Sequence, residues 1–472
     1  MINLINNSLD KEGYVEEIKE IFLKLAKEKR IRYGELRLEE SEVTNISFRG
    51  KELEELSVSK SVGGNIRILG RCGWGFISFN DINTEAITDY FEEACNASNL
   101  ITGEEIEIEY SDPVVDRVVF PMGRDFRDIP IEEKKRLLSE YNDIMLNFSP
   151  KIQSTVVRYG DRFNKRYFIN TEGTDIVQEK GDISSVLIAL AREEDLIEQY
   201  HYSTGSIEGF QIMENLHDKA RDTAEMAVRL LSAPVVKGGQ YTVILDPRLA
   251  GVFIHEAFGH LSEADHVYEN ERLKELMLIG KRFGPDFLNV VDDPTYPNLR
   301  GSYRYDDEGI LSRKTYLIRE GILSGRLHSR ETARKMGEPV TGNARSINYR
   351  FQPIVRMSNT FIVPGSSSFD ELISDIKHGI YAVGAYGGQT SMEMFTFSAQ
   401  EGYMIENGKI GDMVRDVVLT GNVFTTLQNV EAIGNDLQFS QGGGCGKGGQ
   451  SPLPVATGSP HIRIRNVVIG GR

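Results

Sequence analysis

The sequence predicts an α+β protein of two domains: an N-terminal domain of mixed helices and β-meander, residues 1–233, and a β-rich C-terminal domain, residues 234–472, carrying the helix of a candidate metal site. Two observations predict this class. Amphipathic helical repeats alternate with antiparallel-looking strand runs before residue 232, whereas strand and hairpin patterns dominate beyond Asn289. The segment from Ser232 to Gly239, which contains Pro234, is the expected boundary.

The N-terminal domain is expected to contain four helices and several strands. Val15, Ile18 and Phe22 recur at helical spacing, and Asn83 and Pro130 suit the starts of later helices. The expected helices cover residues 10–30, a stretch from 83, residues 130–146 and residues 211–231. The expected strands cover residues 35–49 and 53–60, a run ending at 79, and a meander over 152–204.

The C-terminal domain is expected to open with a strand over residues 241–245, followed directly by a helix. Asp246 can cap this helix, with Pro247 at its first position. Two later hairpins are predicted around Glu320-Gly321 and Asn407-Gly408, because such pairs tolerate the positive φ that tight hairpin turns need. A Gly-rich segment from residue 441 precedes a last strand near residues 461–465.

The composition is that of a globular protein without an obvious affinity for polyanions. The 472 residues are 40% hydrophobic and carry a net charge of −16, which disfavours nonspecific binding to nucleic acid or to anionic membrane. Residues 1–7 lack a signal-peptide pattern, and no apolar stretch reaches the ~20 residues of a membrane helix. Three cysteines make no disulfide framework, so a cytoplasmic location is expected.

The stretch from His255 through Glu256 to His260 carries the most chemical information. Neutral imidazoles bind zinc, and a neighbouring carboxylate can take a proton from an attacking water. The metalloprotease pattern HExxH places its histidines four residues apart, on one helix face. A spacing of five rotates the second ring roughly 140° off that face of an α-helix. We therefore expect a π-bulge or a kink, which Gly259 would ease.

Two histidines leave a catalytic zinc site incomplete, because such sites usually have three protein ligands. The candidates are Cys445, Glu263, Asp265 and His266, the last two also as groups that support a ligand. Glycines flank Cys445 and would let the backbone approach an ion, and Lys447 would favour the thiolate. The alternatives are a surface loop with an incidental thiol and a pair of histidines packed in the core. The same loop departs from the phosphate-loop pattern, so nucleotide binding is rejected.

Beyond these residues, the chain resembles the TldD/PmbA peptidase family, in particular its metal-bearing TldD branch. The resemblance covers nearly the whole chain and is most specific in the C-terminal half. The blocks that carry it are residues 255–260 with Glu263 and Asp265, then 305–309, 341–345, 356–360, 364–365, 397–399, 405–408, 433–437 and 445–450. A looser match surrounds residues 63–67 and 75–76.

The resemblance implies a zinc ion held by His255, His260 and Cys445, with Glu256 as general base. It implies a two-domain α+β subunit that pairs with a TldE/PmbA-like subunit or with a copy of itself. The implied activity is hydrolysis of short or unfolded peptides inside an enclosed chamber. Ser346, where the family often has Arg, and a longer Gly run before Cys445 are small departures, and neither changes a ligand position.

The expected function is therefore a cytoplasmic zinc-dependent peptidase, with Glu263 as the alternative third ligand. A noncatalytic partner subunit, or a regulator that binds peptides or a protein target, is the alternative function. The sequence indicates no substrate-binding residue; Arg345, Arg356 and Tyr305 are polar candidates for stabilising an oxyanion. Metal content separates the alternatives, because a stoichiometric zinc favours the enzyme.

Overall fold

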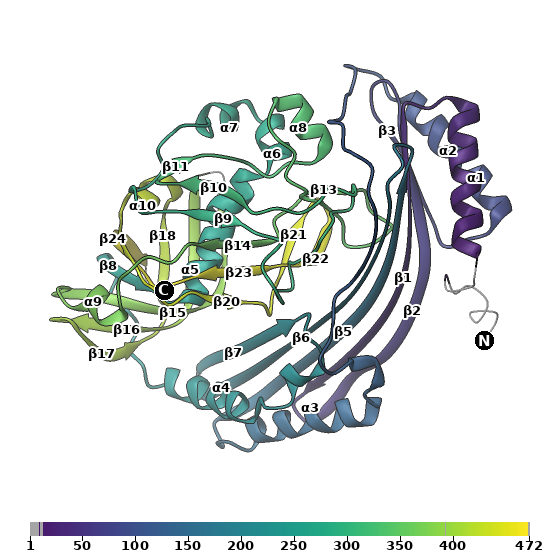
Figure 1. Ribbon diagram of the computed structural model, residues 1–472. Coiled ribbons are helices and arrows are strands. Elements are labelled where there is room, and N and C mark those ends of the chain that lie inside the picture. Colours follow the sequence, from purple (N-terminus) through teal and green to yellow (C-terminus); the bar gives the residue numbers. More distant parts are fainter. Residues whose placement is uncertain (1–8, 10–12, 392, 471–472) are drawn as a thin grey trace.

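The N-terminal half forms one long, curved sheet (Figure 1). A computed structural model describes Leu9, residues 13–391 and residues 393–470. The strands run in the order β3-β2-β1-β5-β6-β4, and β7 also pairs with β6; only β4 runs parallel to its neighbour. The strands are β1 (Tyr33–Arg49), β2 (Glu52–Leu69), β3 (Trp74–Phe79), β4 (Val115–Val119), β5 (Ile152–Asn170), β6 (Asp175–Glu193) and β7 (Leu196–Ser206).

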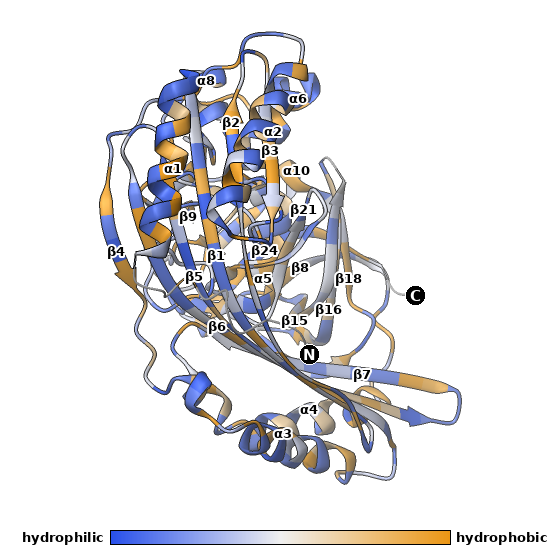
Figure 2. Cartoon of the chain, turned by 90° about the vertical axis from the view of Figure 1, so that its right-hand side faces the viewer, coloured by the Kyte–Doolittle hydropathy of each residue, from blue (hydrophilic) through white to orange (hydrophobic). Residues whose placement is uncertain are grey.

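Helices pack at the two ends of this sheet. Phe22 of α1 and Phe91 of α2 are buried together at one end, whereas Tyr141 of α3 and Ala224 of α4 are buried with Leu187 of β6 at the other. Figure 2 shows hydrophobic and hydrophilic residues alternating along the long strands, as expected when one sheet face packs on helices. The helices are α1 (Tyr14–Lys29), α2 (Thr84–Leu100), η1 (Phe126–Asp128), α3 (Ile131–Leu146), η2 (Phe210–Met213) and α4 (His217–Leu230).

The expected helix starts at Asn83 and Pro130 are confirmed. The Asn83 side chain accepts a hydrogen bond from the Ala86 amide, and Pro130 occupies the N-cap position of α3. The expected helix over residues 211–231 is wrong at its start, because η2 precedes α4 as a separate short turn. Phe210 and Met213 are buried, and the Tyr141 hydroxyl donates to the Met213 carbonyl, which takes that carbonyl away from a continuous helix.

Strand β2 continues past its expected end at residue 60 as far as Leu69. Gly63 and Gly64 look like turn residues, yet they lie inside the strand. A Cβ on Gly64 would lie 2.6 Å from the Arg37 carbonyl oxygen and 2.9 Å from the Phe79 ring. These glycines therefore permit close packing between neighbouring strands.

The C-terminal half consists of two sheets that share helix α5 (Pro247–Ile254), which contacts β15 of one and β23 of the other. Val243, Phe253, Phe258 and Phe397 lie in the large buried cluster around α5. The first sheet contains β8 (Gly239–Leu245), β15 (His378–Ser391), β16 (Met394–Glu406), β17 (Lys409–Val414), β18 (Val418–Asn422), β19 (Val430–Ile433) and β24 (Ile462–Gly470). The second contains β9 (Val290–Asp292), β10 (Thr315–Arg319), β11 (Ile322–Leu323), β14 (Asn359–Ile362), β20 (Gln438–Ser440) and β23 (Ala456–Ser459).

Both predicted hairpins are confirmed, as β10–β11 and β16–β17. Glu320-Gly321 and Asn407-Gly408 all adopt positive φ at these turns. The remaining elements are α6 (Ala264–Glu269), α7 (Glu271–Leu276), α8 (Arg330–Met336), α9 (Phe369–Ile373), α10 (Val423–Gln428), and two small hairpins, β12 (Ala344–Arg345) with β13 (Ile354–Val355) and β21 (Gly444–Lys447) with β22 (Gln450–Pro454).

A buried ion-pair network joins the curved sheet to the C-terminal half. Its members are Glu35, Arg37 and Arg67 on β1 and β2, and Asp307 and Glu308 in the loop before β10; each is at most 7% exposed. The Arg67 guanidinium lies 2.7 Å from both Glu35 and Glu308, and that of Arg37 lies 3.1 Å from Asp307. The concave face of the sheet is thus held against the C-terminal half by paired charges (Figure 1).

Within the described part of the chain, no helix is both long and apolar enough to cross a membrane. Residues 1–7, on which the signal-peptide expectation rests, lie outside the described residues.

Candidate metal centre

The helix that carries the two histidines changes geometry at the first of them. The Asp246 side chain accepts from the Leu249 amide at 2.8 Å and Pro247 opens α5, as predicted. Residues His255–Gly259 then form a π turn, labelled η3, followed by a 3₁₀ turn over His260–Ser262, labelled η4. The expected departure from α geometry is confirmed. A π turn accommodates one extra residue, so it returns a side chain five positions later to the same side.

His255, His260 and Cys445 come together despite their separation in sequence. One ligand atom from each lies within 4.8 Å of the other two. The Cys445 Sγ is 3.5 Å from the His260 Nε2, and the two imidazole ring centroids are 5.3 Å apart. His255 and Cys445 are buried and His260 is half-buried. The predicted proximity of Cys445 to both histidines is therefore confirmed.

Glu256 lies at the open side of this cluster. Its two carboxylate oxygens are 4.0 Å from the His255 Nε2 and 3.9 Å from the His260 Nε2. The Glu256 side chain keeps 31% of its surface exposed, in contrast to 3% for His255. This carboxylate is consequently near both imidazoles and also within reach of water.

Glu263 lies on the far side of His260, away from the cluster. This fully buried carboxylate is 2.9 Å from the His260 Nδ1, so it can hold the ring with its Nε2 free to bind an ion. His266 Nδ1 is 3.8 Å from the same Glu263 oxygen. Of the alternatives for a third ligand, the geometry favours Cys445, with Glu263 as an orienting group behind His260.

Lys447 does not contact the thiol that it was expected to activate. Its Nζ lies 3.1 Å from Glu263 and 2.6 Å from Asp265, and it donates to the Val355 carbonyl at 2.8 Å. Residues two apart on a regular strand point to the same side. A register shift lies between Cys445 and Lys447 on β21, so their side chains reach different partners. Lys447 therefore supports Glu263, and Asp265 pairs with Lys447 from another side.

Electrostatics in this cluster favour a charged thiolate. Burial raises the pKa of the Cys445 thiol, but hydrogen bonds to His255 and His260 outweigh burial and lower that pKa to about 5. Burial lowers the pKa of His260, whereas Cys445 and Glu263 raise it more strongly, to about 10. Burial likewise raises the pKa of Glu263, but His260 and Lys447 bring it down to about 2.

The donor set fits a zinc ion. Two imidazoles and one thiolate are ligands that zinc prefers, and three protein ligands leave a fourth position for water or substrate. The His255 Nδ1 is buried and lacks a hydrogen-bond partner among the described residues, so protein groups do not satisfy every polar atom of this set. Other histidines have non-metal partners: His328 contacts Glu338, and His461 contacts Asp436.

The three polar candidates for oxyanion stabilisation are engaged elsewhere. Arg345 donates to the Met357 and Pro454 carbonyls, and the Tyr305 hydroxyl donates to Asp116. Arg356 donates to the carbonyl of Cys445 at 2.7 Å and therefore supports the backbone of a candidate ligand instead. Nothing local in the sequence signals this role of Arg356, because 89 positions separate the two residues.

Comparison with known proteins settles the family. Models of the PmbA/TldA metallopeptidase match as domain 1 over residues 34–98, as the central domain over residues 124–231 and as the C-terminal domain over residues 238–471. The chain belongs to the TldD/PmbA metallopeptidase family. All three residues of the cluster lie within the match to the C-terminal domain.

Named relatives show the activity of this TldD/PmbA protein. A metalloprotease from Synechocystis sp. is 46% identical, over 92% of this chain and 94% of its own. A zinc metalloprotease TldD homolog from Saccharolobus solfataricus is 31% identical, over 95% and 99%. The protein is accordingly a metalloprotease, and its donor cluster is consistent with a bound metal.

Solved structures of distant relatives confirm the mixed α/β fold. A protein from Thermotoga maritima, described as a candidate modulator of a DNA gyrase, superposes with a TM-score of 0.77 at 21% identity and covers 97% of this chain and 100% of its own. TldE from Thermococcus kodakarensis superposes with a TM-score of 0.76 at 18% identity, over 96% and 100%. At these identities the likeness concerns the fold alone.

Proposed function

We propose that this metalloprotease is a zinc-dependent peptidase that hydrolyses short or unfolded peptides. The observation that carries the proposal is the cluster of His255, His260 and Cys445 with the Glu256 carboxylate about 4 Å from both imidazoles. These residue types at these positions suit zinc-assisted hydrolysis better than simple peptide binding, which would need none of them.

The protein residues would divide the chemistry as follows. When bound, zinc would polarise a scissile carbonyl and make water more acidic. His255, His260 and Cys445 would hold the ion, and Glu263 would fix the orientation of His260. Glu256 would accept a proton from the attacking water and deliver it to the nitrogen of the leaving amine.

The fold relationship and the family resemblance support a paired subunit. A TldE protein shares this fold, which motivates pairing with a TldE/PmbA-like subunit or with a second copy of this chain. We propose that pairing encloses the site, so that flexible peptides reach Glu256 and folded proteins do not. Enclosure would also strengthen electrostatic interactions at the site, because it excludes bulk water.

Metal analysis combined with a peptide assay tests the proposal. We expect about one zinc per purified chain, and hydrolysis of an unstructured fluorogenic peptide that a chelator abolishes and added zinc restores. The assay is run on the chain alone and with a TldE/PmbA-like subunit. A chain without zinc that hydrolyses nothing in either arrangement would favour the alternative, a noncatalytic or regulatory peptide-binding subunit.

A further inference from the structure

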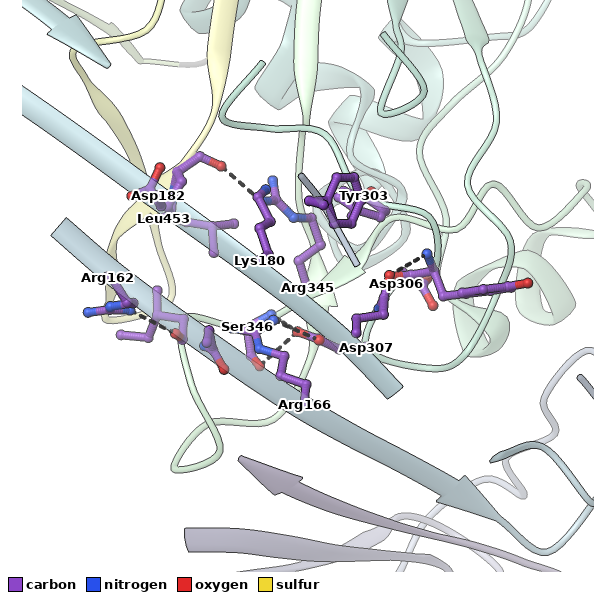
Figure 3. A pocket seen from close by; sticks show the side chains of 16 residues that line it. Arg162, Arg166, Lys180, Asp182, Tyr303, Asp306, Asp307, Arg345, Ser346 and Leu453 are labelled. Carbon is purple, nitrogen blue, oxygen red and sulfur yellow. Dashed lines mark hydrogen bonds and ion pairs between the residues drawn. The ribbon is translucent and has the colours of Figure 1, made fainter. Parts of the chain in front are cut away.

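A cavity of about 90 Å³ lies between the curved sheet and the C-terminal half (Figure 3). Its walls come from β5 and β6 on one side and from the segments 303–307, 345–347 and 453–454 on the other. This volume suits a small polar group with a few water molecules. Both halves of the chain are needed to build it.

Three cations line this cavity without a carboxylate partner within the described chain. The Lys180 Nζ donates to the carbonyls of Arg300 and Ser302, at 2.8 and 2.6 Å. Arg345 donates to two backbone carbonyls, and the Arg162 guanidinium lies 3.5 Å from one more. Carbonyl oxygens accept from these groups, whereas carboxylates act on them only at longer range: Asp182 on Lys180 and Arg162, and Asp307 on Arg345.

Two of the three carboxylates that line the cavity are paired with arginines, and the third, Asp306, accepts among the described residues only from the backbone amides of Glu308, Ile310 and Ala344. Burial and the neighbouring Glu308 raise the pKa of Asp306 well above its usual range, which favours its neutral form. Asp182 makes two hydrogen bonds with Arg300, at 2.6 and 2.8 Å. Asp307 lies 3.1 Å from both Arg37 and Arg166. The cavity therefore carries an excess of positive charge within a chain whose net charge is −16.

The protonation of Lys180 reflects this imbalance. Burial, and then the neighbouring positive charge of Arg345, lower the pKa of Lys180 to about 7. Burial also lowers the pKa of Arg345. Arg345 is buried and Lys180 and Arg162 are half-buried. Cations that are shielded from water and lack an ion-pair partner are costly, and an anion in the cavity would relieve that cost.

The hairpin that carries Cys445 forms one wall of the cavity. Leu453, which lines it, pairs directly with Cys445 across the β21–β22 hairpin, a spacing of about 5 Å between Cα atoms. Asn164, another lining residue, is buried, and its Oδ1 lacks a partner among the described residues, so it can accept a peptide N–H. Figure 3 shows the lining side chains converging from both halves.

We propose that this cavity is a subsite that binds a carboxylate group of the peptide substrate, an inference that rests on the proposed peptidase function. Lys180, Arg162 and Arg345 supply the charge, and Asn164 accepts a backbone N–H beside it. The carboxylate comes from the peptide C-terminus or from an acidic side chain. A substrate anchored here lies along the hairpin that presents Cys445.

Binding to metal-free protein tests this subsite apart from hydrolysis, since a carboxylate could otherwise bind the zinc. The probes are a fluorescein-labelled tetra-alanine with a free C-terminal carboxylate, the same peptide as its C-terminal amide, and the amide with one alanine replaced by glutamate. Fluorescence anisotropy with chelator-treated full-length chain should show the free acid binding about tenfold more tightly than the amide. A glutamate peptide that binds equally tightly would identify an acidic side chain as the source.

Variants of residues that line the cavity test whether the carboxylate preference comes from this site. In Lys180→Gln, the affinities for the free-acid and amide peptides should differ by no more than about twofold. The glutamine side chain can still donate a hydrogen bond but carries no charge. The matched control, Lys165→Gln, removes a lysine that pairs with Glu179 on the same sheet and should keep the tenfold preference. Arg162→Gln serves as second variant if thermal unfolding shows that Lys180→Gln is misfolded.

Equal binding of all three probes by the wild type, or a preference that survives in both cavity variants, would overturn the proposal. If zinc-loaded wild-type protein hydrolyses no peptide but the metal-free protein still prefers the free acid, only the peptidase function is contradicted. The two failures are therefore distinguishable.

Discussion

Glu256 and His255 are adjacent in the sequence, yet we propose different roles for them: His255 as a metal ligand and Glu256 as the general base. Glu256→Ala should keep zinc and fold while lowering kcat for peptide hydrolysis by about 10²–10⁴, because the general base is not a ligand. His255→Ala should lose both metal and activity. Metal analysis and kcat of both variants check this expectation. Equal zinc loss in the two variants would make Glu256 a ligand and refute its role as base.

Glu263 offers a subtler test, because it contacts His260 at Nδ1, the ring nitrogen that faces away from the cluster, and also pairs with Lys447. Glu263→Gln should weaken zinc binding about 10- to 100-fold without unfolding the chain, since an amide orients the ring less firmly than a carboxylate. Competition with a chelator of known affinity measures the change. Asp265→Asn is the matched control; it contacts Lys447 and should have a smaller effect. A larger loss in the control would contradict the role given to Glu263.

The pKa of Lys180 predicts how carboxylate binding depends on pH. The charged groups around Lys180 are Arg345, Arg166 and Arg300 and the carboxylate of Asp182, whose pKa lies below its usual range. Asp306 also lines the cavity, and burial raises its pKa well above the usual range, so Lys180→Gln is needed to separate its contribution from that of Lys180. Because the pKa of Lys180 is lowered to about 7, its cation is present below pH 7 and is lost above it. Affinity of metal-free chain for the free-acid probe should fall between pH 7 and 9, and remain flat in Lys180→Gln. If the affinity of Lys180→Gln for the free-acid probe changes with pH as it does in the wild type, Lys180 is not the group that titrates.

Among single residues, those with strong local signals could be predicted from the sequence. Local patterns single out the two histidines, Glu256 and the Gly-flanked Cys445, and the structure brings these four residues together; their roles stay a prediction. The contacts of Lys447 and Arg356 were not, because each reaches a group on another element through the tertiary fold. The residues next to a long, flexible side chain in the sequence do not indicate which of several possible partners it will contact.

The π turn at η3 is the element on which the centre depends. A Cβ added to Gly259 would lie 2.1 Å from the Met357 Sδ, and Met357 is fully buried. Gly259→Ala should therefore cost about 1–3 kcal/mol of stability and weaken zinc binding, as the turn shifts away from Met357. Denaturant unfolding and zinc competition measure both effects.

Met357→Ala provides the comparison. If the clash is responsible, the double variant Gly259→Ala/Met357→Ala should be more stable than the sum of the single costs implies. Strict additivity would show that the steric argument is wrong.

Element boundaries set by caps and turns were predictable, whereas those set by packing were not. Asn83, Pro247 and the Asn407-Gly408 turn act through their own backbone geometry. The break between η2 and α4 depends on Tyr141, about 70 residues earlier in the chain, and glycines 63 and 64 depend on β1 and β3. The parallel pairing of β4 with β6 likewise has no local signature.

At the scale of the whole molecule, the proposed enclosure predicts selectivity for flexible substrates. The assembled dimer should cleave a short unstructured peptide at least tenfold faster than the same segment inside a stable folded protein, because the folded segment must first unfold locally. Size-exclusion fractions assayed separately identify the active species. Equal rates on both substrates, or full activity in monomer fractions, would refute enclosure while leaving the metal chemistry intact.

The boundary at residues 233 and 234 stays a prediction. The β-rich character of the C-terminal half could be read from its hairpins, but the single sheet that unites residues 33–206 could not, because strand order is set by pairings between distant segments.

The ion-pair network between the two halves affects the cooperativity of thermal unfolding. Separating the halves would break the Arg67–Glu308 and Arg37–Asp307 ion pairs, while Arg67 would keep Glu35 and Arg37 would keep Glu39. These ion pairs therefore couple the two halves, and either half alone would lack part of the network. The chain should behave as one cooperative block, with a single transition in calorimetry. A fragment that ends at residue 233 would expose to solvent the face of the curved sheet that normally contacts the C-terminal half, with Arg37 and Arg67 on it.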